Sequence, residues 1–197
     1  MNANSFLEQL GVYVRPGFLS ESECRDLIAG IRKSSQVRGG LYDESKEVHY
    51  DSEVRQVSEV AKRVDGAAAL KERLLGLRSE LSGHFETDVE KIEGPTLLAY
   101  GPGDFFLPHT DSGDGGRVQG RKVTAVVYLN SPGSPEGEGY EGADLSLYGL
   151  MSFPGAENHG LPVAAETGLL VAFPSGMRHG VDELVRGSRY CAVSWFR

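Results

Sequence analysis

The first half of the chain contains two stretches in which apolar residues follow the spacing of a helix. In residues 18–35 the apolar positions lie three, four and seven residues apart and share one face: Cys24, Leu27, Ile28 and Ile31. Just before them, Ser20 and Glu23 form the S-x-x-E pattern of a capping box, which satisfies free backbone N–H groups where a helix begins. The pattern predicts a helix in this stretch.

The second stretch, residues 67–83, repeats the helical spacing with longer apolar side chains. Its apolar positions step by threes and fours: Ala67, Leu70, Leu74, Leu77 and Leu81. Gly83 follows them, and glycine is the residue that most often stands just beyond the end of a helix. We therefore predict a single helix that ends at Gly83. Between the two stretches, residues 37–56 are polar and contain Gly39 and Gly40, which indicates a long loop or hairpin.

After Gly94 the spacing changes to that of strands. Five short runs rich in β-branched and aromatic residues are separated by Gly, Pro, Asn and Asp: residues 95–101, 122–130, 143–149, 168–174 and 189–196. Helices followed by strands favour an α+β fold, here a mostly antiparallel β-sandwich or jelly roll with the helices packed on one outer face. The 197 residues suit one domain, in which residues 1–94 supply mainly helical support and the long loop, and residues 95–197 form the β core.

Composition and charge narrow the classes of function. With 40% hydrophobic and 24% charged residues the chain has an ordinary globular composition. The net charge is -8 and no dense Lys/Arg cluster is present, so we expect no nucleic-acid partner. No apolar run approaches the roughly 20 residues of a membrane-spanning helix, and no signal-peptide pattern is evident. Cys24 and Cys191 form neither a metal-binding nor a disulfide pattern, which indicates a reducing compartment. From these observations together we expect a cytoplasmic protein without a membrane partner.

The stretch "LPHTDSGDGG", residues 107–116, places a histidine two residues before an aspartate. In extended backbone, residues i and i+2 point to the same side, so His109 and Asp111 can reach one ion together. An imidazole nitrogen and a carboxylate oxygen suit a first-row divalent metal. Two alternatives stay open. The stretch can be a polar turn before Gly113, and His49-Tyr50-Asp51 repeats the same spacing within the charged loop.

A third candidate ligand, His179, lies far downstream. It follows the apolar run 169–173, and a histidine at the exit of such a strand can point into the mouth of a jelly roll. Two histidines and one carboxylate make a facial triad that leaves three coordination positions open. Asp111 suits this triad better than Asp114, which stands in the glycine-rich turn. The alternative for His179 is a strand-end histidine bonded to backbone.

Two strand faces suggest a pocket for an anion. By the strand period of two, one face of residues 189–196 carries Arg189, Cys191, Val193 and Trp195. If that face lines the interior, the guanidinium of Arg189 needs an anionic partner, and a ligand carboxylate held by two hydrogen bonds meets that need. Thr124, Val126 and Tyr128 likewise share a face, from which Tyr128 can donate its hydroxyl to the same carboxylate. The alternative for Arg189 is a surface ion pair, for example with Glu183.

Five motifs in this order resemble the catalytic core of the Fe(II)- and 2-oxoglutarate-dependent dioxygenases, in particular the prolyl 4-hydroxylase-like branch: "AYGPGDFFLPHTD", "RKVTAVVYLN", "GADLSLYG", "GLLVAFPSGMRHGV" and "GSRYCAVSWF". The resemblance covers residues 97–197 and implies a double-stranded β-helix, or jelly-roll, core. It implies an enzyme that hydroxylates an unactivated C–H bond, expected in a prolyl residue of a peptide or protein, and releases succinate and CO2. Fe(II), 2-oxoglutarate and O2 are the implied cofactor and cosubstrates, and ascorbate is a candidate addition.

The resemblance also assigns roles to single residues. The iron ligands of the family match His109, Asp111 and His179. The residue that binds the distal carboxylate of 2-oxoglutarate matches Arg189, and the surrounding cosubstrate pocket matches Tyr128 and Tyr100, with Thr124 on the same inward face. Positions near the substrate entrance match Trp195 and Arg121. Taken without the resemblance, the tyrosines and Trp195 can be ordinary core residues, and Arg121 can be a solvated charge.

Departures from the family pattern concern the substrate. The family's "GGxLRLY"-type run stands here as "GADLSLY", and the loops 131–142 and 149–167 are long and rich in Gly and Pro. Because both features are expected near the substrate entrance, a free amino acid or small metabolite remains the alternative to a peptidyl proline. A ligand-binding jelly roll without catalysis is a second alternative. A nucleic-acid demethylase is a third, but those enzymes carry an arginine where this chain has Trp195.

Overall fold

The computed structural model describes residues 3–42, 48–60, 64–133 and 139–197. The helices, two of them short 3-10 turns, are α1 (Ala3–Gln9), α2 (Glu21–Lys33), α3 (Ala67–Leu75), α4 (Arg78–Phe85), η1 (Gly116–Val118) and η2 (Ala156–Asn158). The strands of the first half are β1 (Tyr13–Arg15), β2 (Gln36–Arg38), β3 (Leu41–Tyr42), β4 (Val48–His49), β5 (Arg55–Gln56) and β6 (Ser58–Val60). Those of the second half are β7 (Ile92–Tyr100), β8 (Phe105–His109), β9 (Val123–Tyr128), β10 (Tyr140–Gly142), β11 (Leu145–Tyr148), β12 (Gly160–Pro162), β13 (Leu170–Pro174), β14 (His179–Val181), β15 (Leu184–Gly187) and β16 (Arg189–Phe196).

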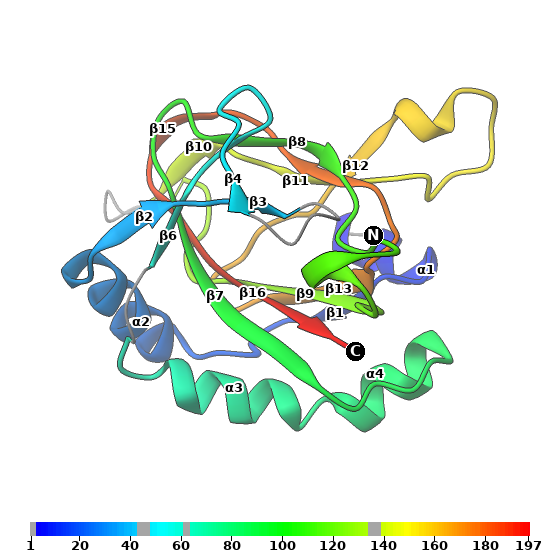
Figure 1. The fold of residues 1–197 in the computed structure, drawn as a ribbon, viewed down its shortest axis with the longest axis horizontal. Helices are drawn as coiled ribbons and strands as arrows, with labels where there is room; N and C mark the ends of the chain where they lie inside the picture. The colour runs from blue at the N-terminus through cyan, green and yellow to red at the C-terminus, as the bar shows by residue number, and fades with distance from the viewer. Residues whose placement is uncertain (1–2, 43–47, 61–63, 134–138) are drawn as a thin grey trace.

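Two antiparallel sheets face each other across the interior of the molecule (Figure 1). The large sheet has the strand order β1-β13-β9-β16-β7-β6-β2, and the smaller one has the order β12-β11-β14-β8-β5. Neighbouring strands run antiparallel in both sheets. The expected α+β fold with a jelly-roll core is therefore confirmed.

Helices α2, α3 and α4 pack on the outer face of the large sheet, as predicted (Figure 1). Helix α2 begins after Ser20, whose side chain and that of Glu23 form the capping box expected from the sequence. Its four buried residues are those that the spacing singled out: Cys24, Leu27, Ile28 and Ile31. Burying an aliphatic side chain of this size contributes about 1.5–3 kcal/mol, so this face anchors the helix to the sheet.

The prediction of one helix over residues 67–83 was wrong, because the chain forms two. Helix α3 ends at Leu75 and is followed by Gly76, a residue with low helix propensity, and a new helix, α4, starts at Arg78. Gly83 lies inside α4, which ends at Phe85 and is capped by Glu86 in the left-handed conformation with φ 50°. Two shorter helices can follow the twist of the sheet and still bury their leucines against it.

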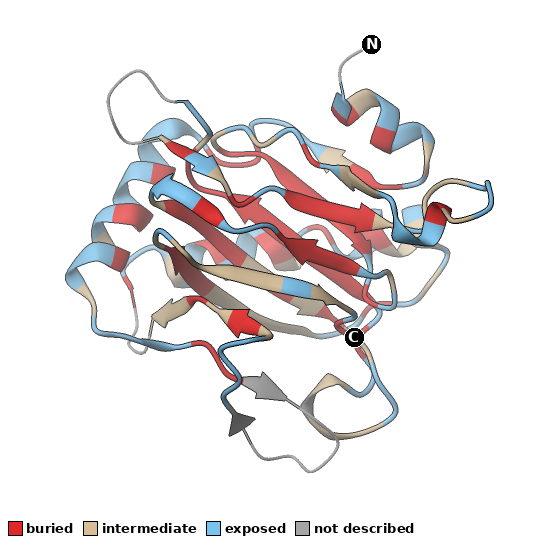
Figure 2. Cartoon of the chain, turned by 90° about the horizontal axis from the view of Figure 1, so that it is seen from above, coloured by how far each residue is buried: buried red, intermediate tan, exposed pale blue. Residues whose placement is uncertain are grey.

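The inner face of the large sheet carries the alternation predicted for its central strands. On β16, three residues pack toward the helices: Tyr190, Ala192 and Phe196. Four residues on the opposite face line a cavity between the two sheets: Arg189, Cys191, Val193 and Trp195. On β9 the cavity side carries Thr124 and Val126. Figure 2 shows the buried residues concentrated in these strands and the exposed ones on the outer surfaces of the helices.

Residues 1–94 contribute strands as well as helices. Strands β1, β2 and β6 extend the large sheet, and β5 forms an edge of the smaller one. Residues 37–56 include a short hairpin, in which β3 pairs with β4. These strands have only two or three residues, too few for a period of two to stand out. None of the helices in the described ranges is long and apolar enough to span a bilayer.

Candidate metal and cosubstrate site

Two neighbouring strands of the smaller sheet bring the two candidate histidines together. His109 ends β8, His179 begins β14, and the two residues are paired in register. Their imidazole centroids lie 4.4 Å apart. Asp111 follows β8 by two residues, and its backbone N–H donates to the carbonyl of Ser175 at 2.8 Å. The loop after β8 is thereby tied to the loop before β14, which sets the position of the carboxylate.

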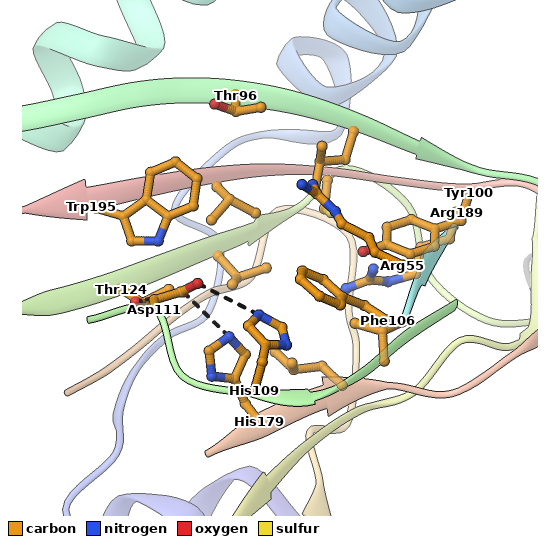
Figure 3. Close-up of a pocket in the computed structure, with 16 residues that line it drawn as sticks. Arg55, Thr96, Tyr100, Phe106, His109, Asp111, Thr124, His179, Arg189 and Trp195 are labelled. Atoms are coloured by element: carbon orange, nitrogen blue, oxygen red, sulfur yellow. Dashed lines mark hydrogen bonds and ion pairs between the residues drawn. The ribbon is translucent and has the colours of Figure 1, made fainter. Parts of the chain in front are cut away.

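The three side chains converge on one point (Figure 3). Oδ1 of Asp111 lies 3.5 Å from Nε2 of His109, and Oδ2 lies 3.3 Å from Nε2 of His179. One ligand atom from each residue falls within 4.8 Å of the others. Two imidazoles and one carboxylate form a donor set that suits a first-row divalent metal. Within the part of the chain that the structure describes, this is the group that could hold such an ion.

Hydrogen bonds outside the cluster orient all three groups. Nδ1 of His109 lies 2.8 Å from the carbonyl oxygen of Leu107, and Nδ1 of His179 lies 2.9 Å from that of Met177. When each imidazole carries its proton on Nδ1, that N–H donates to the carbonyl, and the lone pair of Nε2 points into the cluster. Thr124 donates its hydroxyl to Oδ2 of Asp111 at 2.9 Å. Such contacts fix the tautomer and the direction of metal ligands.

The electrostatics favour the forms that bind a metal. Burial disfavours the charged imidazole and lowers the pKa of His109 below its ordinary 6.5. For Asp111, burial opposes ionisation, but the neighbouring imidazoles of His109 and His179 outweigh it and hold the pKa of the carboxyl well below its usual range. At neutral pH the site therefore offers an uncharged His109 and an ionised Asp111, as metal binding requires.

The cavity runs from this cluster between the sheets to Arg189, on the first residue of β16. Arg189 is 1% exposed, and its Nε and Nη1 have no hydrogen-bond partner among the described residues. Its guanidinium lies 4.9 Å from the ring centroid of Tyr100 and 5.1 Å from that of Tyr128. Glu183 forms no ion pair with it, so the alternative of a surface ion pair between these two described residues was wrong. A buried cation with unused donors fits an anionic ligand.

Three tyrosines surround this guanidinium. The hydroxyls of Tyr128 and Tyr140 are buried without a partner in the described part of the chain. Burial raises the pKa of Tyr100 and of Tyr140 to about 12 and raises that of Tyr128 as well. All three phenols therefore stay protonated at neutral pH and can donate hydrogen bonds. Tyr140, from the short strand β10, was missed in the sequence because a polar, glycine-rich loop surrounds it.

A second cavity adjoins the cluster on its outer side and is bordered by Trp195 and Arg121. Arg121 is buried rather than solvated, and its guanidinium lies 3.8 Å from the ring centroid of Trp195. Nε and Nη2 of Arg121 donate to the two carboxylate oxygens of Glu93 at 3.2 and 2.9 Å. The indole N–H of Trp195 is buried and, as far as the described residues extend, has no acceptor. The two residues matched to the substrate entrance thus lie together beside the cluster.

Arg55 borders both cavities and was not singled out from the sequence. It is 8% exposed, and its Nη2 lies 2.8 Å from Oε1 of Glu59. In a polar loop with charges of both signs, nothing distinguishes a buried arginine from a solvated one. The pairing of β5 with β8 brings this side chain to the cluster, and that pairing cannot be read from two residues.

Other candidates lie elsewhere. The side chain of His49 is outside the described part of the structure, and Asp51 is exposed and accepts a hydrogen bond from the backbone N–H of Glu53. Asp114 is also exposed. Among described residues, the loops 131–142 and 149–167 supply none that line the two cavities, so the expectation that they border the substrate entrance finds no support.

Comparison with known proteins agrees with this geometry. The sequence profile of the 2OG-Fe(II) oxygenase superfamily matches residues 95–197. The chain belongs to this superfamily. Membership implies Fe(II), 2-oxoglutarate and O2 as cofactor and cosubstrates, and the cluster of His109, Asp111 and His179 could bind the iron.

Cyanobacterial proteins are among the similar sequences. A PKHD-type hydroxylase of Picosynechococcus sp. is 31% identical over 74% of this chain, and a PKHD-type hydroxylase of Thermosynechococcus vestitus is 28% identical over 86%. The matched segments cover 61% and 68% of those two relatives. This chain thus spans only part of the length of the curated relatives.

Solved structures of prolyl hydroxylases share the fold. A Pseudomonas putida prolyl-4-hydroxylase superposes with a TM-score of 0.72 at 23% identity, covering 99% of this chain and 98% of the other. A Trichoplax adhaerens prolyl hydroxylase, solved in complex with a peptide fragment of the hypoxia inducible factor oxygen degradation domain, gives a TM-score of 0.73 at 19% identity, covering 98% of this chain and 86% of the other. At these identities the likeness confirms the architecture.

Proposed function

We propose that the chain is an Fe(II)- and 2-oxoglutarate-dependent hydroxylase that acts on a prolyl residue of a peptide or protein and releases succinate and CO2. One observation carries the proposal. The cluster of His109, Asp111 and His179 stands at one end of a cavity whose other end is the buried guanidinium of Arg189, two nitrogens of which have no partner among the described residues. A metal site and a carboxylate site facing one another suit a chelating dicarboxylate.

In this proposal His109, Asp111 and His179 hold the iron. The donor set fits, because two neutral imidazoles and one carboxylate satisfy Fe(II) and leave half of an octahedron open. When bound, iron would activate O2, which is the oxidant, and 2-oxoglutarate would supply two of the electrons as it is converted to succinate and CO2, while the unactivated C–H bond that is hydroxylated would supply the other two. The protein's own contribution is to hold, orient and shield them. Thr124 keeps the carboxylate of Asp111 turned toward the histidines.

Arg189 holds the distal carboxylate of 2-oxoglutarate through its guanidinium, and this contact neutralises the buried cation. Tyr128 donates its hydroxyl to the same carboxylate, since it is protonated, buried and otherwise without an acceptor in the described region. Tyr100 forms the wall beside the guanidinium. Apolar residues close the cavity and exclude bulk water: Leu98, Val126, Leu145 and Val181.

The outer cavity receives the substrate beside Trp195 and Arg121. Both arginines that border it are already matched by carboxylates, Arg121 by Glu93 and Arg55 by Glu59. A free amino acid would need an unmatched cation for its carboxylate, whereas a peptide segment is neutral there. The indole N–H of Trp195, which lacks an acceptor among the described residues, can donate to a peptide carbonyl. These features support a peptidyl substrate over a free amino acid.

The relatives support the same choice of reaction. The PKHD-type hydroxylases and the two prolyl hydroxylase structures are named for hydroxylation, and the Trichoplax enzyme was solved with a peptide in place. We also propose that residues 1–197 act as one catalytic domain. In support, strands from residues 1–94 complete both sheets around the core of residues 95–197.

The test is a turnover assay with Fe(II), 2-oxoglutarate, O2 and ascorbate, in which succinate is measured together with the mass of the substrate. Proline-containing peptides should gain one oxygen atom, in a one-to-one ratio with succinate. His179→Ala should abolish both products. Coupled turnover with free amino acids or metabolites but not with peptides would replace the proposed substrate. Absence of succinate under every condition, together with no metal binding that depends on His179, would refute the enzyme itself.

A further inference from the structure

Three side chains are stacked in a column that ends on the first candidate iron ligand. The guanidinium of Arg55 lies 4.8 Å from the ring centroid of Phe106. The Phe106 ring in turn stacks on the His109 imidazole, with 3.5 Å between centroids and an interplanar angle of 17°. Figure 3 shows the three residues, with Phe106 between the other two. We call this set the Arg55 column.

The foot of the column is built into the fold. Arg55 and Phe106 are directly paired residues of the neighbouring strands β5 and β8. Nη2 of Arg55 lies 2.8 Å from Glu59, and Nη1 donates to the carbonyl of Gly40. A Cβ atom at Gly39 would lie 2.9 Å from Cζ of Arg55 and 2.9 Å from Cγ1 of Val57, so a larger residue there would displace these side chains. Gly39 of the polar loop thus leaves room for the guanidinium of Arg55.

The head of the column controls the imidazole. The hydrogen bond from Nδ1 to Leu107 sets the tautomer of His109 but acts at a single ring atom. The parallel Phe106 ring restricts the tilt of the imidazole plane, which decides where the lone pair of Nε2 points. Among the described residues no ring stacks in parallel on His179, which Phe173 meets edge to face at 4.8 Å. The two imidazoles are thus held by different aromatic contacts, a stacked one for His109 and an edge-to-face one for His179.

We propose that Arg55 is a positioning residue of the metal site: it holds Phe106 against His109 and so fixes the direction in which His109 presents Nε2 to the metal. This inference rests on the proposed function, since it takes His109 as an iron ligand. It gives the polar loop 37–56 a role through its last strand, β5. Loss of an outer contact that orients a metal ligand typically weakens metal binding about 10- to 100-fold.

The chain contains a matched control on its far side. Arg73 lies 5.2 Å from the ring centroid of Phe18 and pairs with Glu23 at 2.8 Å. It therefore repeats the combination of arginine, glutamate and phenylalanine, but it packs at helices α2 and α3, away from the cavities. Arg73→Gln tests whether losing such a combination affects metal binding in general.

The experiment titrates the metal-free, full-length protein with Co(II) alone, without 2-oxoglutarate or substrate, and follows the d–d absorption of the bound ion. Arg55→Gln and Phe106→Leu should each weaken Co(II) affinity by about tenfold or more and alter the absorption spectrum. Phe106→Tyr keeps an aromatic face and should restore the wild-type values. Arg73→Gln should leave both unchanged. Circular dichroism checks that each variant is folded.

The outcomes separate this inference from the proposed function. If the wild-type protein binds no Co(II), or binds it equally well after His179→Ala, the metal site itself is refuted. If the wild-type protein binds Co(II) through His179 but folded Arg55→Gln keeps wild-type affinity and spectrum, only the Arg55 column is refuted. Should Arg55→Gln fail to fold, the double variant Arg55→Met/Glu59→Gln, which removes both charges, takes its place. If the double variant also fails to fold, the Phe106 variants decide. Wild-type Co(II) affinity in Phe106→Leu refutes the proposal, whereas weakened affinity in Phe106→Leu together with wild-type affinity in Phe106→Tyr supports it.

Discussion

The hydroxyl of Thr124 lies 2.9 Å from Oδ2 of Asp111 and joins the large sheet to the carboxylate of the metal cluster. Thr124 is fully buried on β9, and its hydroxyl also lies 3.0 Å from that of Ser175. The carboxylate would lose a donor that sets its rotation if this hydroxyl were removed.

Thr124→Val keeps the shape of the side chain and removes the hydrogen bond. We expect Co(II) or Fe(II) affinity to fall by about 10- to 100-fold, since outer partners of metal ligands have effects of that size. Thr124→Ser should recover most of the loss because it retains the hydroxyl. Equilibrium metal titration measures the effect. Equal affinity in the valine and serine variants would show that the contact does not orient Asp111.

The unused donors of Arg189 lead to a prediction about 2-oxoglutarate. Truncating one partner of a buried charge pair costs about 2–5 kcal/mol, so Arg189→Gln should raise the Kd for 2-oxoglutarate at least about 30-fold. Arg189→Lys keeps the charge but cannot form two parallel hydrogen bonds, so its Kd for 2-oxoglutarate should lie between those of the wild-type protein and Arg189→Gln. Metal affinity measured without 2-oxoglutarate should stay unchanged. A glutamine variant that binds 2-oxoglutarate normally would place the cosubstrate elsewhere.

The sequence predicted the features that depend on a regular period. The capping box and apolar face of α2 followed from a spacing of three and four, and the inward faces of β9 and β16 followed from a spacing of two. His109 and Asp111 were distinguished from His49 and Asp51 only by motifs far downstream. The structure brings them to His179 through a strand pairing between β8 and β14 that no local pattern contains.

Features set by tertiary pairing escaped prediction. Arg55 reaches the site through the two-residue edge strand β5, and Glu93 reaches it from the start of β7. Their ion pairs with Glu59 and Arg121 look like ordinary surface charges in a sequence. The break between α3 and α4 reflects the fit of two helices to one sheet, which helical spacing cannot reveal. A local pattern reports which face of an element is apolar, but not which other element covers it.

The lowered pKa of His109 predicts how stability changes with pH in the metal-free protein. Because burial holds this pKa below 6.5 in the folded state, the unfolded chain binds more protons between the two values. The free energy of unfolding should therefore decrease as pH falls below about 6.5. Asp111, whose folded pKa is also lowered, adds stability that is fully present above its ordinary pKa of 3.8 and is lost as the pH falls toward its folded value.

Urea denaturation between about pH 7.5 and pH 5 measures this dependence. His109→Gln removes the titrating ring and should show a shallower decrease than the wild-type protein over the same range. Identical slopes for the two proteins would show that His109 titrates normally in the folded state.

The pair of Arg121 and Glu93 predicts a stability difference outside the metal site. Arg121 is buried beneath Trp195, and Glu93 also accepts from Arg197. Glu93→Gln leaves a buried guanidinium with a weaker acceptor and should lower the free energy of unfolding by about 2 kcal/mol. Glu141→Gln removes an exposed ion pair with Arg186 and should cost less than about 1 kcal/mol. Chemical denaturation of both variants gives the comparison, and equal losses would contradict the buried role of Arg121.

Gly180 controls the distance between the strands that carry the two histidines. A Cβ atom there would lie 3.0 Å from the backbone nitrogen of Pro108 and 3.1 Å from the carbonyl oxygen of Phe106, both on β8. Gly180→Ala must therefore push β14 away from β8 and separate His179 from His109. We expect metal affinity to fall by about tenfold or more, because ligand geometry is lost while every ligand remains. Gly83→Ala, in open space on α4, serves as the control and should bind metal normally. Wild-type Co(II) affinity in folded Gly180→Ala would show that the spacing between β8 and β14 tolerates the added methyl group.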